Sequence, residues 1–373
     1  MGIGESTLEG LGIMDSPKEL LDFYRGKKVF ITGHTGFKGT YLSEVLKAAG
    51  ADVTGYSLEP PTEPSLFELA DTGEGMTSVI GDIRDLESLK KCFDSAGPEI
   101  VFHLAAQPIV RLSYKEPRLT YETNVMGTVN LLECIRESSS VRSFLNVTTD
   151  KVYLNEDLDR AFTEDMPLDG YDPYSNSKSC SELVTHSYRK SFFAEGGPAI
   201  STARAGNVIG GGDFAQDRLV PDCVRSVEEG KPMILRNPAS IRPFQHVLEP
   251  VFIYLQIAKA QYEDRAKEGC YNVGPEISDC ISAGEITERF ARCWGEGFKI
   301  EVRPDGGPHE AKFLRLDCTR LKETFGWRSV WNIDIAIEKC VEMSREYVRG
   351  RRLGDILKRQ IEEYALAAEK VWG

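Results

Sequence analysis

The sequence predicts an α/β protein: a doubly wound parallel sheet with a smaller α/β domain attached. Two observations lead to this prediction. Short apolar runs alternate with helical patterns from residue 27 to about residue 205, which is the rhythm of parallel strands joined by helical crossovers. After about residue 206 this rhythm changes, and Gly- and Pro-rich connections interrupt shorter elements.

The expected elements follow one another along the chain. A short helix begins in "SPKELLDFYRG", with Ser16 as N-cap and Pro17 at the first helical position. Strands are expected at the apolar runs 28–33, 51–58, 78–82, 100–106, 143–149 and 199–210. Helices are expected between them at residues 39–50, 85–96, 121–139 and 175–196.

The change of rhythm sets the predicted domain boundaries. Residues 1–25 form an N-terminal extension, and residues 26–205 form the first domain. The second domain comprises residues 206–244 and 276–373. The segments "VLEPVFIYLQIAKAQY" and "CYNVG", within about 245–275, are expected to return to the first domain and extend its core.

Composition excludes several classes of function. A formal net charge of -13 over 373 residues leaves no basic excess for binding a nucleic-acid backbone. The nine cysteines contain no C-x-x-C pair and the five histidines are dispersed, so we expect free thiols and no metal site. No apolar run approaches the length of a membrane span, and no signal peptide is recognisable. We therefore expect a cytoplasmic protein without a membrane partner.

A glycine turn follows the first predicted strand. "VFITGHTGFKG" places Gly33, Gly36 and Gly39 between an apolar strand and an amphipathic helix. Such a turn lets the backbone approach a pyrophosphate, which then rests on the N-terminus of the helix. We therefore expect a Rossmann-type dinucleotide site, with Lys38 adding a cation. The cofactor residues expected in this turn are Gly33, Thr35, Gly36, Phe37, Lys38 and Gly39.

The following strand ends should line the rest of the cofactor. Ser57 stands where an acidic ribose ligand is common, and no arginine follows it to bind a 2′-phosphate, so NAD is favoured over NADP. Asp82 and Ile83 are expected near the adenine. The nicotinamide half is expected beside Leu104, Ala105, Ala106 and Gln107.

Two further motifs carry reactive groups. The run "SFLNVTTDK" ends in two hydroxyls, a carboxylate and an ammonium group, which indicates either an ordinary turn or proton chemistry. "DPYSNSKS" places Tyr174 and Lys178 four residues apart, on one face of a helix. An ammonium group and a positively charged cofactor ring near a phenol would favour its ionised form.

Together the glycine turn, the "GD" at 81–82, Tyr174 and Lys178 resemble the extended short-chain dehydrogenase/reductase family. The resemblance implies that Tyr174 is the catalytic acid/base and that Lys178 orients the cofactor ribose and lowers the pKa of the tyrosine. Thr149 occupies the place of the hydroxyl that binds substrate. Threonine followed by acid/base residues is similar to the nucleotide-sugar 4,6-dehydratases, which implies that Thr149, Asp150 and Lys151 are the active trio.

Lysine at the third place of that trio resembles the subgroup acting on CDP-glucose. Segments such as "GHTGFKG", "TTDKVY" and "HEAKFLRLD" agree, and the resemblance extends over roughly residues 22–345. It implies oxidation at C4, elimination of water across C5 and C6, and return of hydride to C6, yielding CDP-4-dehydro-6-deoxy-D-glucose. Asp150 would protonate the leaving hydroxyl. Lys151 is either the base at C5 or a charge that stabilises the enolate.

The same resemblance implies that the second domain binds substrate. Arg242 is the first choice for the diphosphate, with Arg218 and Asn207 next and His309 closing over the site; each could instead be an ordinary surface or turn residue. The family also implies a homodimer or homotetramer. Three other functions stay open: a dehydratase for another nucleotide sugar, a 4-epimerase, and a non-catalytic NAD-binding regulator.

Overall fold

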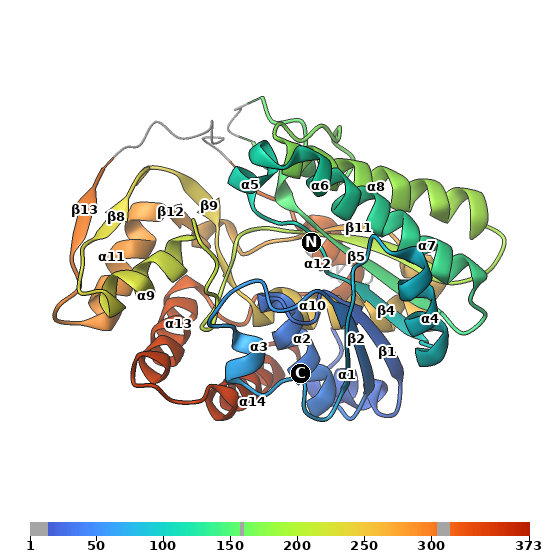
Figure 1. The fold of residues 1–373 in the computed structure, drawn as a ribbon, viewed down its shortest axis with the longest axis horizontal. Helices are drawn as coiled ribbons and strands as arrows, with labels where there is room; N and C mark the ends of the chain where they lie inside the picture. The colour runs from blue at the N-terminus through green and yellow to red at the C-terminus, as the bar shows by residue number, and fades with distance from the viewer. Residues whose placement is uncertain (1–13, 157–159, 304–313) are drawn as a thin grey trace, which may run out of the picture.

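The computed structural model describes residues 14–156, 160–303 and 314–373. Its centre is a seven-stranded parallel sheet of order β3-β2-β1-β4-β5-β6-β11 (Figure 1). Its strands are β1 (Lys28–Thr32), β2 (Asp52–Ser57), β3 (Thr77–Ile80), β4 (Ile100–His103), β5 (Ser143–Thr149), β6 (Ala199–Ala205) and β11 (Cys270–Val273). The reversal of strand order beside β1 and β4 confirms the doubly wound fold predicted from the sequence.

Helices cover both faces of this sheet. On one face lie α4 (Leu86–Ala96), α7 (Gly127–Glu137) and α8 (Pro173–Phe192), which contact one another or the strands. On the other face lie α2 (Phe37–Ala48) and α10 (Leu248–Glu263). Cover on both faces explains why β5 and β6 are buried at every position, and their polar residues Asn146 and Arg204 are hydrogen-bonded to α8.

Short helical segments connect these layers. They are α3 (Leu66–Leu69), α5 (Val110–Lys115), α6 (Pro117–Tyr121), the π-helical turn η1 (Glu122–Met126), and the 3-10 turns η2 (Asp150–Val152), η3 (Arg265–Lys267) and η4 (Ile277–Asp279). The sequence predicted one uninterrupted helix at 121–139; the structure instead joins η1 directly to α7. Asp172 caps α8 by accepting a hydrogen bond from the Ser175 amide at 3.0 Å.

A second lobe lies beside the carboxyl ends of the strands (Figure 1). Three strand pairs build its small sheets: β7 with β10, β8 with β13, and β9 with β12. Their bounds are β7 (Val208–Ile209), β8 (Met233–Leu235), β9 (Ile241–Pro243), β10 (Gln245–His246), β12 (Cys280–Ser282) and β13 (Ile300–Val302). The accompanying helices are α9 (Leu219–Glu228), α11 (Ala283–Trp294) and α13 (Ile333–Val348), whereas α12 (Thr319–Phe325) packs on β11 of the central sheet.

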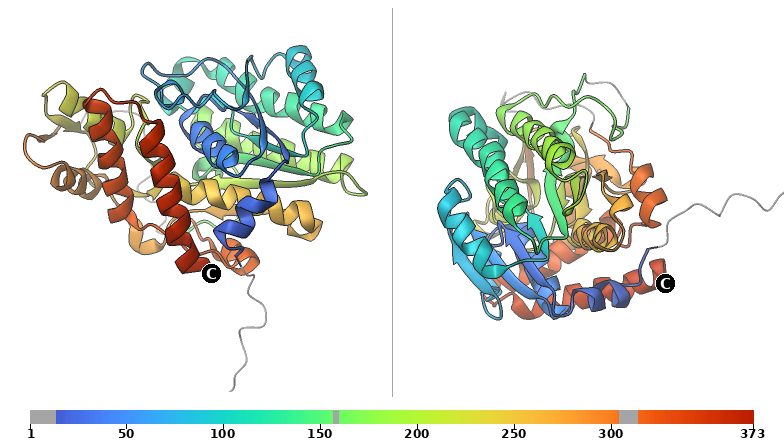
Figure 2. Two further views of the ribbon diagram at one scale, coloured as in Figure 1. Left: turned by 90° about the horizontal axis from the view of Figure 1, so that it is seen from below. Right: turned by 90° about the vertical axis from the view of Figure 1, so that its right-hand side faces the viewer.

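The chain crosses between the lobes more than once. Helix α10 packs on β5 and β6, and β11 pairs with β6 in parallel. The first and last helices, α1 (Pro17–Tyr24) and α14 (Gly354–Trp372), lie side by side on the outside of this layer (Figure 2). Ser16 caps α1 with a capping box, as its sequence predicts. Helix α14 thus contacts the first lobe, and the division into domains stays a prediction.

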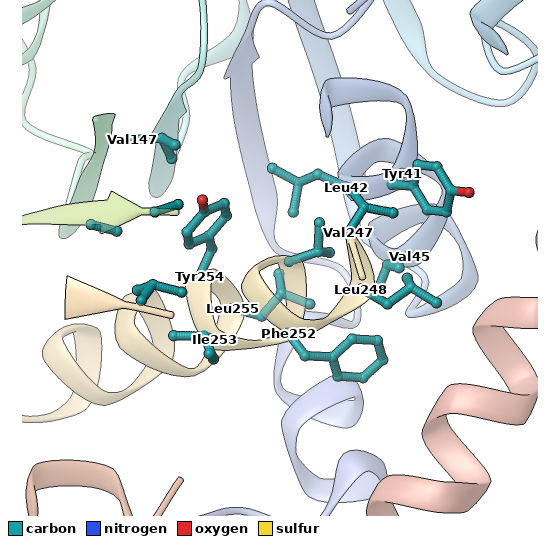
Figure 3. Close-up of a cluster of buried hydrophobic side chains, with 14 of the residues drawn as sticks. Tyr41, Leu42, Val45, Val147, Val247, Leu248, Phe252, Ile253, Tyr254 and Leu255 are labelled. Atoms are coloured by element: carbon teal, nitrogen blue, oxygen red, sulfur yellow. The ribbon is translucent and has the colours of Figure 1, made fainter. Parts of the chain in front are cut away.

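The core between α2 and α10 supports the glycine turn from below. Leu42 and Val45 of α2 meet Val247 and Leu248 at the start of α10, whereas Tyr254 projects toward the end of β5 (Figure 3). Over the ranges that the structure describes, no helix combines the length and apolarity needed to cross a bilayer.

Candidate active site

The glycine turn has the geometry of a phosphate cradle. Gly33 has φ +81°, and a side-chain carbon there would lie 2.7 Å from the amide nitrogen of Ala105. A carbon added at Gly39 would overlap the carbonyl oxygen of Gly33, so α2 packs tightly against the turn. Gly36 is the N-cap of α2 and offers no side-chain cap. The first amides of the helix are therefore available to an anion, which fits the pyrophosphate of a dinucleotide.

Polar side chains connect this turn to the end of β2. The hydroxyls of Thr35 and Ser57 lie 2.9 Å apart, and Thr35 also donates to the Leu58 carbonyl at 2.9 Å. Phe37 is half-buried at the start of α2, with its ring 5.4 Å from that of Tyr41. Ser57 is therefore part of the turn that the sequence assigns to the cofactor.

Lys38 points to the interior of the site. Its Nζ lies 3.5 Å from the hydroxyl of Tyr254. Burial, together with the positive charges of Arg218 and Lys178, lowers the pKa of Lys38 to about 7. Three cations thus act on one another at the junction of the two lobes.

The residues expected at the two ends of the dinucleotide differ in their availability. Asp82 forms an ion pair with Arg84 at 2.5 Å, and the hydrogen bond from this arginine lowers the pKa of the carboxyl. Ile83 is buried against Gly127. Gln107 accepts from the Ile109 amide and donates to Thr120, so its side chain orders the loop after β4. The other expected residues, Leu104, Ala105 and Ala106, are partly exposed at the end of β4.

Strand β5 delivers the reactive segment. Thr149 is its last residue, and its hydroxyl donates to Oδ1 of Asp150 at 3.0 Å and accepts the Lys151 amide at 3.4 Å. Asp150 is 1% exposed, and its Oδ2 has no hydrogen-bond partner among the residues that the structure describes. Burial raises the pKa of Asp150, although the positive charges of Lys151, Arg242 and Lys38 oppose the shift. Burial thus makes this carboxyl bind a proton more tightly than an exposed aspartate does.

Helix α8 brings two reactive groups to the same place. Burial raises the pKa of Tyr174 to about 12, opposed by a hydrogen bond with Thr149. Lys178, one turn later, donates from Nζ to the Val147 carbonyl at 3.2 Å. Burial lowers the pKa of Lys178 to about 8, opposed by the charge of Glu182. In the chain alone, desolvation of the phenolate outweighs the nearby donors, so the lowering of the tyrosine pKa by Lys178 and the cofactor ring stays a prediction for the cofactor complex.

The second lobe contributes cations. Arg218 donates to Oδ2 of Asp213 at 3.0 Å, and its charge lowers the pKa values of Lys38 and Tyr174. Arg242 is 8% exposed, donates to its neighbour's carbonyl at Ile241 and acts electrostatically on Asp150. Both arginines therefore border the reactive groups.

The structure describes only one of the other two expected substrate ligands, Asn207. Asn207 is partly exposed between β6 and β7, and its carbonyl accepts the Gln245 amide at 3.0 Å, which joins β7 to β10. His309 lies outside the residues that the structure describes.

Two features near the site were not predicted from the sequence. Thr148, the first hydroxyl of the polar run that ends β5, donates to Glu182 and is 4% exposed. Tyr254 reaches the site from α10, with its hydroxyl beside Lys38. A tyrosine within the apolar run 248–258 was the available signal, because a buried phenol usually has a polar partner.

Comparison with known proteins identifies the family. Residues 30–340 match the family described as GDP-mannose 4,6 dehydratase. The chain belongs to this family. CDP-glucose 4,6-dehydratase of Salmonella typhimurium is 45% identical over 356 residues, covering 94% of this chain and 99% of that protein. dTDP-glucose 4,6-dehydratase of Xanthomonas campestris is 25% identical, over 84% of this chain and 91% of that protein.

Solved structures of similar proteins agree with the fold. UDP-glucose 4-epimerase from Thermus thermophilus, in complex with NAD, has a TM-score of 0.71 and 25% identity, covering 85% of this chain and 98% of that one. dTDP-glucose 4,6-dehydratase from Bacillus anthracis, also with NAD, has a TM-score of 0.70 at 20% identity, covering 85% and 96%. The Rossmann-type architecture of this 4,6-dehydratase family member is thereby confirmed.

Proposed function

We propose that this chain is an NAD-dependent hydro-lyase that converts CDP-D-glucose to CDP-4-dehydro-6-deoxy-D-glucose in deoxysugar biosynthesis. The observation that carries the reaction type is Asp150, a buried carboxyl with a raised pKa and one unpartnered oxygen beside Tyr174. An acid at this place can protonate a hydroxyl group so that it leaves as water. The choice of nucleotide rests on the 45% identity to the Salmonella enzyme over nearly the full length of both chains.

The glycine turn and the strand ends support NAD as the cofactor. We propose that Gly33, Gly36 and the free amides of α2 hold its pyrophosphate, and that Ser57 and Asp82 border its adenosine half. NAD, when bound, supplies the hydride acceptor for C4, a positive charge in its oxidised form, and the hydride donor for C6. The positive charges of Arg218 and Lys178 near Lys38 favour an anionic ligand there.

Tyr174 is proposed as the base for the sugar 4-hydroxyl. Its phenol is protonated at neutral pH in the chain alone, since its pKa is raised to about 12. It therefore needs added positive charge to accept a proton. Lys178 is proposed to orient the cofactor ribose, and Thr149 to hold the substrate oxygen through the hydroxyl that already contacts Tyr174.

Asp150 is proposed as the acid in the elimination. Once C4 is a ketone, the proton on C5 is acidic, and loss of the C6 hydroxyl requires a proton donor. Burial raises the pKa of Asp150, which suits a carboxyl that supplies this proton. A 4-epimerase breaks no bond to the C6 oxygen and has no use for this acid.

Lys151 has two possible roles that one experiment separates. It either removes the C5 proton or stays charged and stabilises the enolate. Lys151→Met should abolish exchange of solvent deuterium into C5 if the amine is the base. If exchange persists while turnover falls, Lys151 acts through its charge and another group moves the proton.

The diphosphate is proposed to bind the cations of the second lobe. Arg242 and Arg218 border the reactive groups from that side, and Asn207 lies at the start of the crossing between lobes. We keep His309 as a further candidate on the basis of its motif alone. CDP-glucose would thus lie between the sheet edge and the second lobe.

The test is mass spectrometry of CDP-glucose incubated with the protein and NAD, beside UDP-, dTDP- and GDP-sugars. Loss of one water from CDP-glucose alone, without net NADH, is the expected result. Loss of water from one of the other sugars would show that the enzyme acts on a different nucleotide sugar. A new stereoisomer of unchanged mass would indicate an epimerase. NAD binding without any turnover would indicate the regulator.

We also propose a homodimer, or a tetramer built from it, in the cytoplasm. Met126, Leu183 and Phe192 are exposed apolar side chains on η1 and α8, and they offer a face for a second copy. All nine cysteines are free thiols, which suits a reducing compartment. Leu183→Glu should shift the mass measured by light scattering to that of a monomer; an unchanged mass would place the contact elsewhere.

A further inference from the structure

A buried polar cluster lies directly behind the catalytic segment. Its centre is Glu182 on α8, which accepts from the Thr148 hydroxyl at 2.5 Å, the Thr202 hydroxyl at 2.8 Å and Nη2 of Arg204 at 3.0 Å. These four side chains are at most 4% exposed. The carboxylate is therefore fully engaged and ties α8 to the neighbouring strands β5 and β6.

Arg204 continues the cluster to the far side of the catalytic segment. Its Nη1 donates to the Tyr153 hydroxyl and to the Glu164 carbonyl, both at 2.9 Å. The Tyr153 hydroxyl in turn donates to Oδ1 of Asn272 on β11 at 2.5 Å. Tyr153 is thus held in place by two buried partners just after the turn that contains Asp150 and Lys151.

These contacts bracket the reactive residues. Thr148 immediately precedes Thr149, and Tyr153 follows Lys151 by two residues. Glu182 is on the same helix as Lys178, four residues later, and so shares its face. One ion pair therefore contacts the residues on both sides of the catalytic segment and the helix that carries Tyr174.

We propose that the Glu182–Arg204 pair is a positioning device, which holds residues 148 and 153 and thereby sets Thr149–Lys151 against Tyr174 and Lys178. Within the described part of the chain, the carboxyl of Asp150 forms a single hydrogen bond, with Thr149. Its placement therefore depends on the backbone around it, and the backbone is held at its two ends by this pair. The Glu182–Arg204 pair, with Thr148 and Tyr153, is called the clamp below.

The clamp should affect one half of the reaction more than the other. Tyr174 is fixed by its own helix, whereas Asp150 and Lys151 lie on the bracketed segment. In the elimination, a base takes the C5 proton, a double bond forms between C5 and C6 as the C6–O bond breaks, and Asp150 gives its proton to the departing hydroxyl, which leaves as water. Loosening the segment should therefore slow elimination more than oxidation at C4. This expectation rests on the proposed dehydration.

The structure offers two matched pairs of variants. Thr148→Val and Thr202→Val each remove a buried hydroxyl that donates to Glu182, but only Thr148 adjoins the catalytic segment. Tyr153→Phe and Tyr24→Phe each remove a buried phenolic hydroxyl, and that of Tyr24 bonds to the distant Leu255 carbonyl. Purified full-length variants would be compared in kcat, KM, thermal midpoint and absorbance of bound NADH during one turnover.

Thr148→Val and Tyr153→Phe should lower kcat about 10- to 100-fold with KM within about twofold, since sub-ångström misplacement has effects of this size. Bound NADH should accumulate, because oxidation proceeds while elimination stalls. Thr202→Val and Tyr24→Phe should lower the thermal midpoint similarly but keep kcat within about twofold. Equal kcat losses in both members of a pair, or no NADH accumulation, would overturn the clamp as a positioning device.

Hydrogen exchange separates this proposal from the proposed function. Thr148→Val and Tyr153→Phe should speed amide exchange at residues 150–153 by roughly tenfold or more, while Thr202→Val should not. If the wild-type protein dehydrates no nucleotide sugar, the proposed function fails but this exchange pattern still tests the clamp. Unchanged exchange in all variants would refute the clamp whatever the substrate.

Discussion

Asp150 and Glu182 are both buried carboxyls on neighbouring elements, yet their surroundings are opposite. Among residues 14–156, 160–303 and 314–373, the Asp150 carboxyl has one hydrogen bond and one oxygen without a partner, and its pKa is raised. Glu182 accepts three hydrogen bonds, one of them from a guanidinium group. Both carboxyls are buried to the same degree, but they differ in how many hydrogen bonds their oxygens form.

The difference separates a reactive region from a supporting one. A buried polar atom without a partner is costly, so its survival calls for a role that needs the atom free. A saturated, ion-paired carboxylate holds its neighbours in place but has no spare capacity to exchange a proton. In this chain the two regions are joined through adjacent residues, Thr148 and Thr149.

The largest expected effect is in the reactive region. Tyr174→Phe removes the group proposed to take the 4-hydroxyl proton, so kcat should fall about 10²- to 10⁴-fold. The unfolding midpoint in urea should change little, because the phenyl ring keeps the packing. Steady-state kinetics and urea unfolding on the same preparation measure both. Retention of more than a tenth of wild-type kcat would remove Tyr174 from the reaction.

The supporting region should show the reverse pattern, with stability as the main loss. Arg204→Met leaves Glu182 charged and buried without its partner, which costs about 3–5 kcal/mol in the free energy of unfolding. The double variant Glu182→Gln with Arg204→Met removes the orphaned charge and should recover part of that loss. Urea denaturation measures both variants. Equal stability of the single and double variants would show that the ion pair is not the source of the effect.

The smallest expected effect is a gain in stability at the reactive carboxyl. The folded-state pKa of Asp150 is raised above the unfolded value of about 3.9, so the native state binds the proton more tightly. Its contribution to stability is therefore present below the unfolded pKa and is lost as the pH rises through the folded pKa. Between these two pKa values the loss is about 1.4 kcal/mol for each pH unit. Asp150→Asn should lack this decline.

Urea unfolding at pH 4 and pH 7 tests this expectation. The asparagine variant should be as stable as wild type at the lower pH and more stable at the higher pH, while losing dehydration. Equal stability of the two proteins at both values would mean that ionising Asp150 costs nothing in the folded chain, and it would weaken the assignment of this carboxyl as a neutral acid.

The sequence predicted the features that depend on neighbouring residues. The glycine turn and the spacing of Tyr174 and Lys178 are local patterns, and the structure places both at the carboxyl edge of the sheet. The contact between Lys38 and Tyr254 joins residues 216 positions apart, so no local pattern reveals it. Thr148 and Thr149 are adjacent in the chain, but successive strand residues point to opposite faces, so Thr148 meets Glu182 and Thr149 meets Tyr174.

The pKa shifts and ion pairs of the site are the features that the sequence predicts least well, because they depend on tertiary packing. The direction of the change in the Tyr174 pKa depends on how much solvent the folded chain removes, which spacing does not record. Arg204 looked like an ordinary strand residue within "STARAG". Its ion pair with Glu182 appears only when β6 and α8 are packed together.

The late position of β11 in the sequence has a consequence for how this chain is made. The sheet's edge strand and the covering helix α10 are encoded at residues 248–273, after part of the second lobe. A truncated gene product ending near residue 205 would leave the edge of β6 unpaired and aggregation-prone. On the ribosome, the nascent first lobe must likewise wait for roughly seventy further codons, an interval of several seconds at about 5–20 residues per second. Chaperones have their longest opportunity to bind during that interval.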